Sequence, residues 1–330
     1  MKKRLFLHIG SHKTATTFLQ NSFANNPAVM TGLGILYPQS GLIYQAHFKL
    51  SGELRDRALA ERPLDMLPEW AALLAEIDAS RMSTVLISSE DFSWADPQRL
   101  SILAERCDVK ILYYLRSPDS YMESYYNQLV KDFLTKETRT IETYVAEEAM
   151  AFLDVSKVLR PWAQVFGDAA INLRVFDKAA MPGGILRDFL SQLGVKTVPA
   201  FRAPSASILH KVSLPPDALE YLRLSNPWLV RQVGHHDFVL RLIQIAQVHA
   251  DSLQETRSGL LSLRARQMLR ARFRHSQTIA AKAYLGVERC PFPISDAPPP
   301  PADFDQRKPE ADAHVMGRVS ALLRNEGLQA

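Results

Sequence analysis

The first twenty residues, MKKRLFLHIGSHKTATTFLQ, pass from a short apolar strand through a glycine into a polar loop and then into a helix. We predict the strand over Arg4–Ile9 and the helix over Thr17–Ala24. Backbone N–H groups at a helix start point at one spot, glycine lets the backbone approach it, and lysine adds a positive charge. The segment therefore predicts a phosphate-binding loop formed by Gly10, Ser11, His12, Lys13, Thr14, Ala15, Thr16 and Thr17.

This loop differs from a Walker A motif. A Walker A loop places four residues between its two glycines, whereas Lys13 follows Gly10 by only three positions. Ala15 stands where a second glycine is expected. If this position needs a positive φ, the alanine costs about 1 kcal/mol. An ordinary strand–turn–helix with a surface lysine is the alternative interpretation of the segment taken alone.

A second segment points to the same kind of site. Val109–Leu115 (VKILYYL) is a continuous apolar run, which predicts a strand buried on both faces. Arg116 follows it, and Pro118 opens a helix that carries Ser124 two turns further on. We expect Arg116 at the carboxyl end of a sheet strand, where open α/β sheets bind ligands. One anionic group could then contact both Arg116 and Ser124.

Together, the two motifs resemble those of the sulfotransferase family that uses 3′-phosphoadenosine 5′-phosphosulfate (PAPS). The 5′-phosphosulfate loop of that family is similar to the segment from Gly10 to Thr17, and its 3′-phosphate motif is similar to Arg116 and Ser124. The resemblance covers roughly residues 1–195 and points to the bacterial carbohydrate-type branch, whose usual loop reads KTGTT where this chain has KTATT. It implies PAPS as co-substrate, PAP as product, no metal, and a hydroxyl or amine of a saccharide or glycolipid as acceptor.

Sulfuryl transfer also needs a base that accepts the proton of the attacking group. Glu90 directly follows the predicted strand Thr84–Ser89, so we expect it at the same sheet edge as Lys13 and Arg116. We therefore predict Glu90 as the base and Lys13 as the residue that stabilises the leaving group. Asp91 is the other candidate for the base in this segment, and we expect it instead to cap a helix or to orient neighbouring side chains.

Histidines supply a second candidate base. His47 lies in the long loop after the first helix, where contacts to an acceptor are expected, and an exposed or structural histidine is the alternative. His8, on the first strand, is predicted to be packed. His12, inside the loop, either donates a hydrogen bond to the sulfate or faces solvent.

Strands and helices alternate along the chain, which predicts a three-layer α/β fold with a parallel sheet. The resemblance identifies this as the P-loop-containing, sulfotransferase-like fold. From Pro215 onward the pattern is helical, with a long stretch near His236–Gly286 and a terminal helix over His314–Asn325. We predict a PAPS-binding core over residues 1–227 and a helical extension over 228–330 packed on it, forming one domain in all.

Charge and hydropathy restrict the partners. The net charge of the 330 residues is only +4, so nucleic acid is not expected, whereas an anionic cofactor and a saccharide fit this mild bias. The apolar stretch Leu5–Ile9 is too short for a signal peptide or a membrane anchor. We expect a cytoplasmic protein without a transmembrane segment, and peripheral contact with the inner membrane surface is the further option.

Two other features have structural interpretations. Cys107 precedes a predicted buried strand and is expected to be a small core residue. Six arginines predict a solvated basic helix face, or alternatively a rim that attracts an acidic acceptor or a membrane; they are Arg257, Arg264, Arg266, Arg270, Arg272 and Arg274.

Two other classes of function stay open at the level of sequence. One is a P-loop nucleotide kinase or NTPase, which the short loop disfavours. The other is a PAP- or nucleotide-binding protein that has lost catalysis, which Ala15 leaves open.

Overall fold

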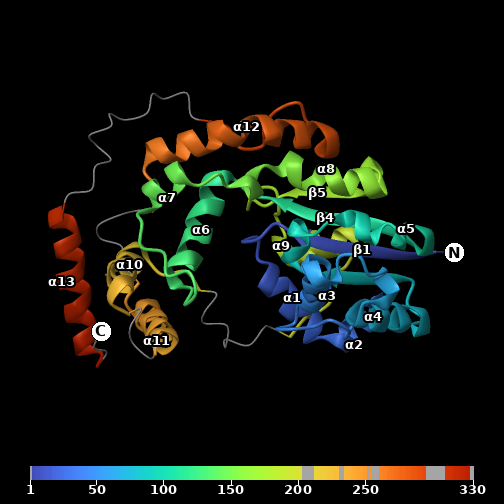
Figure 1. Ribbon diagram of the computed structural model, residues 1–330, viewed down its shortest axis with the longest axis horizontal. Helices are drawn as coiled ribbons and strands as arrows, with labels where there is room; N and C mark the ends of the chain where they lie inside the picture. Colours follow the sequence, from blue (N-terminus) through green and yellow to red (C-terminus); the bar gives the residue numbers. More distant parts are fainter. Residues whose placement is uncertain are drawn as a thin grey trace. The chain divides into compact units, whose positions relative to one another are not determined.

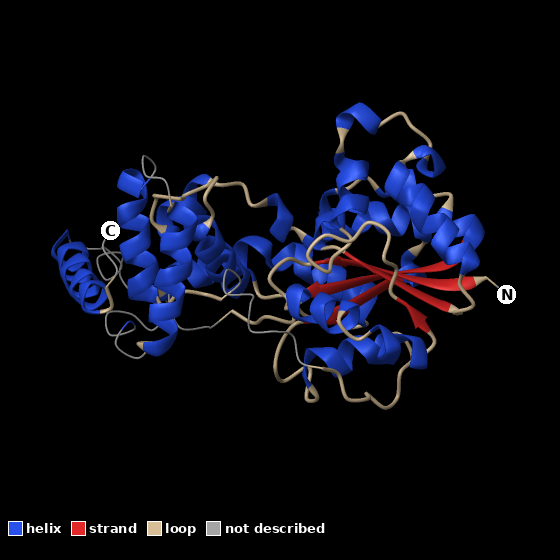
Figure 2. Ribbon diagram, turned by 90° about the horizontal axis from the view of Figure 1, so that it is seen from below, coloured by secondary structure: helices blue, strands red, loops and turns tan. Residues whose placement is uncertain are grey.

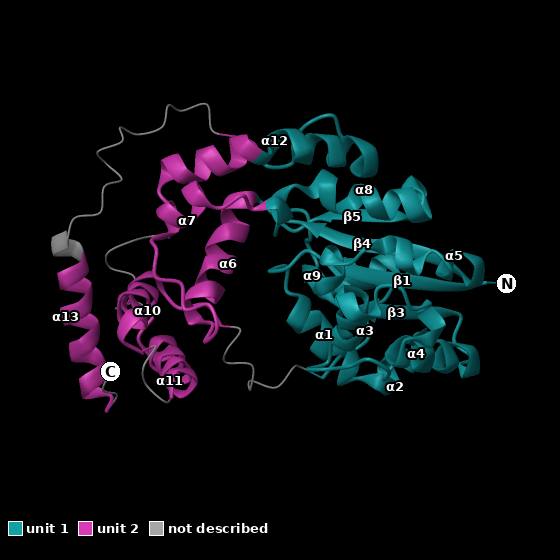
Figure 3. Cartoon of the chain, viewed as in Figure 1, with its two compact units in different colours: residues 1–117, 151–204, 273–292 teal, residues 118–150, 205–272, 293–330 magenta. Residues whose placement is uncertain are grey.

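The computed structural model describes residues 2–202, 212–229, 234–250, 253, 260–294 and 309–327. The chain divides into two compact units, which Figure 3 draws in different colours. Unit 1 contains residues 1–117, 151–204 and 273–292, and unit 2 contains residues 118–150, 205–272 and 293–330. The predicted boundary after residue 227 lies inside helix α10 (Pro216–Leu229) of unit 2.

Unit 1 is built on a sheet of five parallel strands in the order β2-β3-β1-β4-β5. Helices flank both faces of this sheet, as Figures 1 and 2 show. The predicted three-layer α/β fold with a parallel sheet is therefore confirmed. The strands are β1 (Lys3–Gly10), β2 (Ile35–Leu36), β3 (Thr84–Ser88), β4 (Cys107–Leu115) and β5 (Ile171–Val175).

The α-helices that lie wholly in unit 1 are α1 (Thr16–Ala24), α2 (Pro27–Gly32), α3 (Phe48–Arg55), α4 (Pro68–Ala79), α5 (Leu103–Arg106), α8 (Val155–Phe166) and α9 (Gly184–Gln192). Its 3-10 helices are η1 (Arg57–Leu59), η2 (Leu64–Met66), η3 (Glu90–Trp94), η4 (Pro97–Leu100), η5 (Ala151–Leu153) and η6 (Asp168–Ala170). Helix α12 (Leu263–Leu285) belongs to unit 1 only from residue 273 onward.

Strand β4 is buried on both faces, as its apolar run predicts. Successive side chains of a strand point to opposite faces. Ile111 and Tyr113 accordingly pack in the cluster that includes side chains of α3, α4 and α8. Leu112 and Tyr114 pack in the other cluster, with side chains of α1 and α9. Apolar residues at both odd and even positions thus hold the sheet between two helical layers.

The order of the strands places the β1–α1 loop at a functional position. From β1 the chain builds β2 and β3 on one side of the sheet, then crosses to build β4 and β5 on the other side. Open parallel sheets bind ligands at the carboxyl ends of the strands, where the strand order reverses. In unit 1 that point is the carboxyl end of β1, directly before the predicted phosphate-binding loop.

The long loop expected after the first helix is partly ordered into regular elements. The stretch from Asn25 to Lys49 contains α2, β2 and the start of α3. Pro27 lies in the first turn of α2, where proline is favoured. His47 is the N-cap residue of α3 and so does not lie in an open loop.

Unit 2 is helical in the part that the structure describes. It contains α6 (Pro118–Lys131), α7 (Ile141–Glu147), α10, α11 (His235–Val248), α13 (Pro309–Asn325) and the first part of α12. The long helical stretch predicted near His236–Gly286 is two separate helices, α11 and α12. No helix among the described residues combines the length and the apolar character needed to cross a bilayer.

Three of the six clustered arginines have structural partners within unit 2. Asp119 is 0% exposed and accepts two hydrogen bonds from Arg270, at 3.0 and 2.9 Å. Arg266 pairs with Glu123 at 2.6 Å, and Arg272 donates to the carbonyl oxygen of Ala149 at 3.0 Å. The expectation of a purely solvated face is wrong for Arg266 and Arg270, because a half-buried and a buried carboxylate hold them. Arg272 and its acceptor Ala149 are exposed. Arg257 lies outside the described residues.

Candidate phosphate-binding and catalytic site

The loop between β1 and α1 is tightly folded and held to β4. Gly10, Lys13 and Ala15 have φ values of 124°, 64° and 59°, so three residues lie in the left-handed half of φ space within six positions. The Ser11 hydroxyl donates to the carbonyl oxygen of Tyr114 at 2.8 Å, and the Thr14 hydroxyl donates to that of Ser11 at 2.7 Å. The polar side chains of the loop therefore fix its backbone.

Helix α1 begins in a way that suits an anion. Its N-cap, Ala15, makes no side-chain hydrogen bond, and no acidic residue lies in the first turn of the helix. The first N–H groups of a helix lack partners within the helix and carry a partial positive charge. The sequence thus leaves this helix end without a side-chain cap of its own, as phosphate-binding loops do.

The strain at Ala15 gives a testable prediction. Because Ala15 adopts φ 59°, we expect Ala15→Gly to raise the free energy of unfolding by about 1 kcal/mol. Ala75→Gly, at an exposed position inside α4, should instead lower it by about 0.5–1 kcal/mol. Urea denaturation of both variants measures the difference. Destabilisation by both substitutions would contradict the strained backbone at position 15.

Arg116 reaches the loop from the neighbouring strand. It follows β4, which pairs with β1 in parallel, and its Nη1 donates to the carbonyl oxygen of Lys13. Its guanidinium also lies over the ring of Phe176, 5.6 Å from the centroid. The Arg116 guanidinium therefore contacts the backbone of the loop that carries Lys13, within unit 1. Ser124 lies in α6 of unit 2, and its pairing with Arg116 stays a prediction.

Glu90 lies against the loop, at the predicted edge of the sheet. It is the first residue of η3, separated from the end of β3 only by Ser89, and it is only 6% exposed. A Cβ atom placed on Gly10 would lie 3.6 Å from the Cβ of Glu90, so the two segments approach closely. The Thr16 hydroxyl donates to Glu90 Oε1 at 3.1 Å, and Gln20 Nε2 donates to Oε2 at 2.8 Å.

Gln20 was not among the predicted site residues. Its amide also donates to the Ser88 hydroxyl at 3.2 Å, so one side chain holds both the candidate base and the end of β3. Thr16 and Gln20 are four positions apart in α1 and so share one face of the helix. That spacing, next to a loop already identified, was the signal that could have found Gln20.

His8 is packed in the core, as predicted. Its Nδ1 lies 2.8 Å from the Ser88 hydroxyl oxygen, and its ring stands edge-on to Phe189 at 5.0 Å between centroids. Burial lowers the pKa of His8 from 6.5 to about 4, against the opposing influence of the Glu90 charge and the Gly10 carbonyl. His8 is therefore neutral and extends the polar network of Glu90, Gln20 and Ser88.

His47 is a structural residue and is not suited to act as the base. It is 0% exposed, Ser88 N–H donates to its Nδ1 at 3.1 Å, and its Nε2 lies 3.1 Å from the Pro38 carbonyl oxygen. Since Nδ1 accepts, Nε2 carries the proton and donates it to Pro38. Burial lowers the pKa of His47 from 6.5 to about 4. With both ring nitrogens engaged by backbone groups, no ring nitrogen is left to take a proton from an acceptor.

The two buried histidines predict a pH dependence of stability. The pKa values of His8 and His47 are both lowered to about 4 in the folded protein, whereas an unfolded histidine titrates near 6.5. The two neutral histidines therefore contribute fully to the free energy of unfolding above pH 6.5. As the pH falls from 6.5 toward 4, the unfolded chain binds protons that the folded protein does not, and each histidine lowers the free energy of unfolding by about 1.4 kcal/mol per pH unit. Urea denaturation between pH 7 and 5 measures this slope. His47→Gln should remove about half of the part of this slope that comes from the two histidines. An unchanged slope in His47→Gln would contradict the lowered pKa of His47.

His12 and Asp91 belong to a cluster on the outer side of the loop. The His12 ring stacks on Trp94, with centroids 4.3 Å apart, and its Nε2 lies 3.7 Å from Asp91. Asp91 also forms an ion pair with Arg55 at 2.9 Å. Asp91 thus orients neighbouring side chains, as expected, and His12 packs on an indole ring instead of simply facing solvent.

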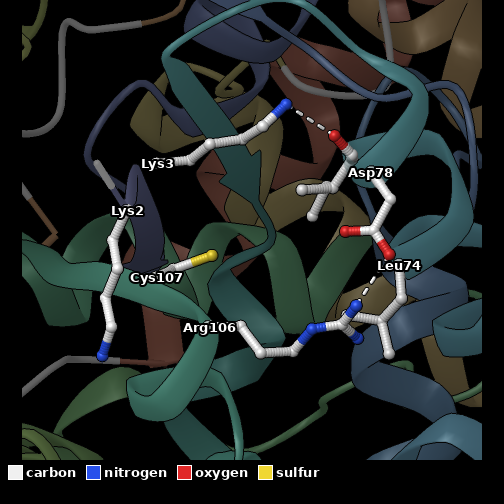
Figure 4. Close-up of a pocket in the computed structure, with 7 residues that line it drawn as sticks. Lys2, Lys3, Leu74, Asp78, Arg106 and Cys107 are labelled. Carbon is white, nitrogen blue, oxygen red and sulfur yellow. Dashed lines mark hydrogen bonds and ion pairs between the residues drawn. The ribbon is translucent and has the colours of Figure 1, made fainter.

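The described part of unit 1 also has a hollow at the opposite, amino edge of the sheet, of about 320 Å³ (Figure 4). Its cations have local partners: Lys3 Nζ donates to the Ile77 carbonyl oxygen, and Arg106 pairs with Asp78, both at 2.7 Å. Cys107 is buried there as a thiol whose pKa burial raises, which confirms it as a small core residue. Because Lys3 and Cys107 begin β1 and β4, this hollow is separate from the loop.

Comparisons with known proteins are few. No family model matches the chain. An uncharacterized protein of Archaeoglobus fulgidus is 33% identical over 87 residues, or 26% of this chain, and the chain spans only 22% of that relative's length. The crystal structure of a sulfotransferase from Alicyclobacillus acidocaldarius is similar with a TM-score of 0.42 and 20% identity, over 72% of this chain and 100% of that one.

Proposed function

We propose that this protein is a PAPS-dependent sulfotransferase. The observation that carries the proposal is the meeting of three anion-binding features at the carboxyl end of β1. These features are the N-terminus of α1 without a side-chain cap, the loop residue Lys13, and Arg116, which donates to the Lys13 carbonyl oxygen. Such a site suits a ligand with several negative charges.

In the proposed mechanism, the loop binds the 5′-phosphosulfate and Arg116 binds the 3′-phosphate together with Ser124. The acceptor oxygen or nitrogen attacks the sulfur atom while the bond from sulfur to the bridging oxygen breaks. The electron pair of that bond stays on PAP, and Lys13 stabilises the charge that develops there. Glu90 takes the proton of the acceptor. These steps use side chains and backbone donors of the chain, and the proposal includes no metal.

We propose a hydroxyl of a saccharide or glycolipid as the acceptor. This part rests on the similarity of the loop sequence to the carbohydrate-type enzymes and on the mild positive charge of the chain. A panel of glycans incubated with radiolabelled PAPS tests it. Transfer to a saccharide or glycolipid supports the proposed acceptor class, and transfer only to phenols or to amines that carry no sugar would contradict it.

The role of Arg116 is tested by the difference between two ligands. A charge-assisted hydrogen bond contributes about 1.5–3 kcal/mol, so Arg116→Ala should weaken PAP binding about 10- to 100-fold. Binding of AMP, which lacks the 3′-phosphate, should change little. Calorimetry with both ligands measures the difference. Arg116→Lys should have a PAP affinity between those of the wild type and Arg116→Ala, because lysine keeps the charge but lacks the two-pronged guanidinium group.

Arg116 also holds the Lys13 carbonyl oxygen, which makes the AMP measurement decisive. Equal losses for PAP and AMP would mean that the substitution only disturbs the loop, and the 3′-phosphate assignment would then be wrong. Because the proposal assigns Ser124 to the 3′-phosphate alone, Ser124→Ala should lower PAP affinity by a smaller factor and leave AMP binding unchanged.

A further inference from the structure

The hydroxyl of Thr16 is committed to Glu90 in this structure. Thr16 is 5% exposed and is the first residue of α1, and its Oγ1 lies 3.1 Å from Glu90 Oε1. An ionised carboxylate can only accept hydrogen bonds, so the single hydroxyl proton of Thr16 must point at Glu90. The hydroxyl then offers only lone pairs to any other group, and lone pairs repel an anion.

An anionic ligand at the start of α1 would compete for that proton. The first N–H groups of the helix bring a phosphate or sulfate oxygen to this turn, and a hydroxyl in the same turn is a natural donor to it. A phosphate or sulfate oxygen and the Glu90 carboxylate oxygen then compete for the one proton of the Thr16 hydroxyl. The Thr16 hydroxyl can serve either of them by rotating about its Cβ–Oγ1 bond, but it cannot serve both at once.

The Glu90 carboxylate does not move with the Thr16 hydroxyl, because Gln20 holds its other oxygen, Oε2. Gln20 donates to Glu90 Oε2 at 2.8 Å and to the Ser88 hydroxyl at 3.2 Å, and Ser88 in turn lies 2.8 Å from His8 Nδ1. These side chains are all buried. Since an ionised carboxylate oxygen can only accept, the Gln20 amide must turn its NH2 group toward Glu90, and this hydrogen bond holds the carboxylate in place.

We propose that the Thr16 hydroxyl is a shared donor that turns from Glu90 to the anionic cofactor when the cofactor binds, so that Glu90 Oε1 becomes available to take the acceptor proton. This inference rests on the proposed function. Without cofactor, the Thr16 hydrogen bond stabilises the ionised carboxylate and weakens it as a base. With cofactor bound, the carboxylate keeps its position through Gln20, loses that hydrogen bond, and becomes a stronger base. Activation of the acceptor is thereby coupled to the presence of the cofactor.

The test follows the Glu90 carboxyl carbon by NMR of glutamate labelled with carbon-13, with Glu90→Gln used to assign the signal. PAP serves as the ligand because it binds without transferring a group. The titration midpoint is measured with and without saturating PAP in the wild type, in Thr16→Val, which lacks the hydroxyl, and in Thr16→Ser, which keeps it. Binding of PAP is measured separately by calorimetry.

In the wild type and in Thr16→Ser, PAP should raise the midpoint through its own charge and through loss of the Thr16 hydrogen bond. In Thr16→Val the midpoint should already be higher without PAP, and PAP should add only the effect of its charge. The PAP-induced shift should therefore be smaller in Thr16→Val by about one pH unit, the scale of one net hydrogen bond. Gln20→Met should move the midpoint in both states and leave the PAP-induced shift as in the wild type.

Equal PAP-induced shifts in the wild type and in Thr16→Val, with PAP bound to both, would overturn the shared-donor inference and leave the proposed function standing. Absence of PAP binding to the wild type would overturn the proposed function, and this inference with it. Thr16→Ala removes the same hydroxyl and replaces Thr16→Val if the valine variant does not fold.

Discussion

Replacing Lys13 with alanine is expected to lower kcat by a factor of about 100 or more, the scale for the loss of one preorganised charge donor. The ammonium group acts on charge that develops in the transition state, so PAP binding should fall less than kcat does. Steady-state kinetics and calorimetry on the same preparation give both numbers. A kcat within about threefold of the wild-type value would show that this loop has been assigned wrongly.

The backbone of the loop supplies a control for this experiment. Lys13 has a φ of 64°, so alanine at this position also carries strain. Lys13→Gly removes the charge without that strain, and it should lose kcat to the same extent if the charge is what matters. Lys49→Ala removes a lysine that pairs with Glu69 in α4, and it should leave kcat unchanged.

The second large effect is expected at Glu90. General bases contribute about 10²–10⁴-fold to kcat, so Glu90→Gln should lose that much, while PAP affinity stays nearly constant. Glutamine keeps the size of glutamate and can still hydrogen-bond to its neighbours, but it cannot take a proton. Asp91→Asn should cost much less, because Asp91 is engaged with Arg55 and lies beside His12.

A different pattern would reassign the base. If Glu90→Gln kept near-normal turnover and His47→Ala abolished it in a protein of unchanged fold, the base would be His47 and Glu90 a positioning residue. The buried contacts of His47 with Ser88 and Pro38 argue for the opposite result, a variant that loses stability before it loses chemistry.

Those parts of the site that depend on strand ends could be predicted from the sequence. Lys13, Glu90 and Arg116 lie within three positions after the ends of the apolar strands β1, β3 and β4, and parallel strands bring their carboxyl ends to one edge. The possible strain at Ala15 could also be anticipated, because a loop of this type often needs a left-handed residue there. The structure gives that residue a φ of 59°.

The parts that depend on contacts between distant segments could not be predicted. The spacing of Thr16 and Gln20 places both on one face of α1, but it does not indicate that the Gln20 amide holds Glu90, seventy positions further on. His47 was expected in a loop, where an exposed position was one alternative, yet the end of β3 and Pro38 enclose it. The stacking of His12 on Trp94 is another contact of this kind. Such contacts follow from the assembled fold and leave no local pattern.

Equilibrium binding of PAP, ATP and GTP, each measured with EDTA and with Mg²⁺, tests the central claim most directly. A PAPS-dependent enzyme should bind PAP with the same affinity in both conditions, because Lys13, Arg116 and the start of α1 supply the positive charge. It should bind ATP and GTP at least about tenfold more weakly, since neither has a 3′-phosphate for Arg116. Tighter binding of a nucleoside triphosphate that requires Mg²⁺ would contradict the account and would place the protein among the P-loop kinases and NTPases.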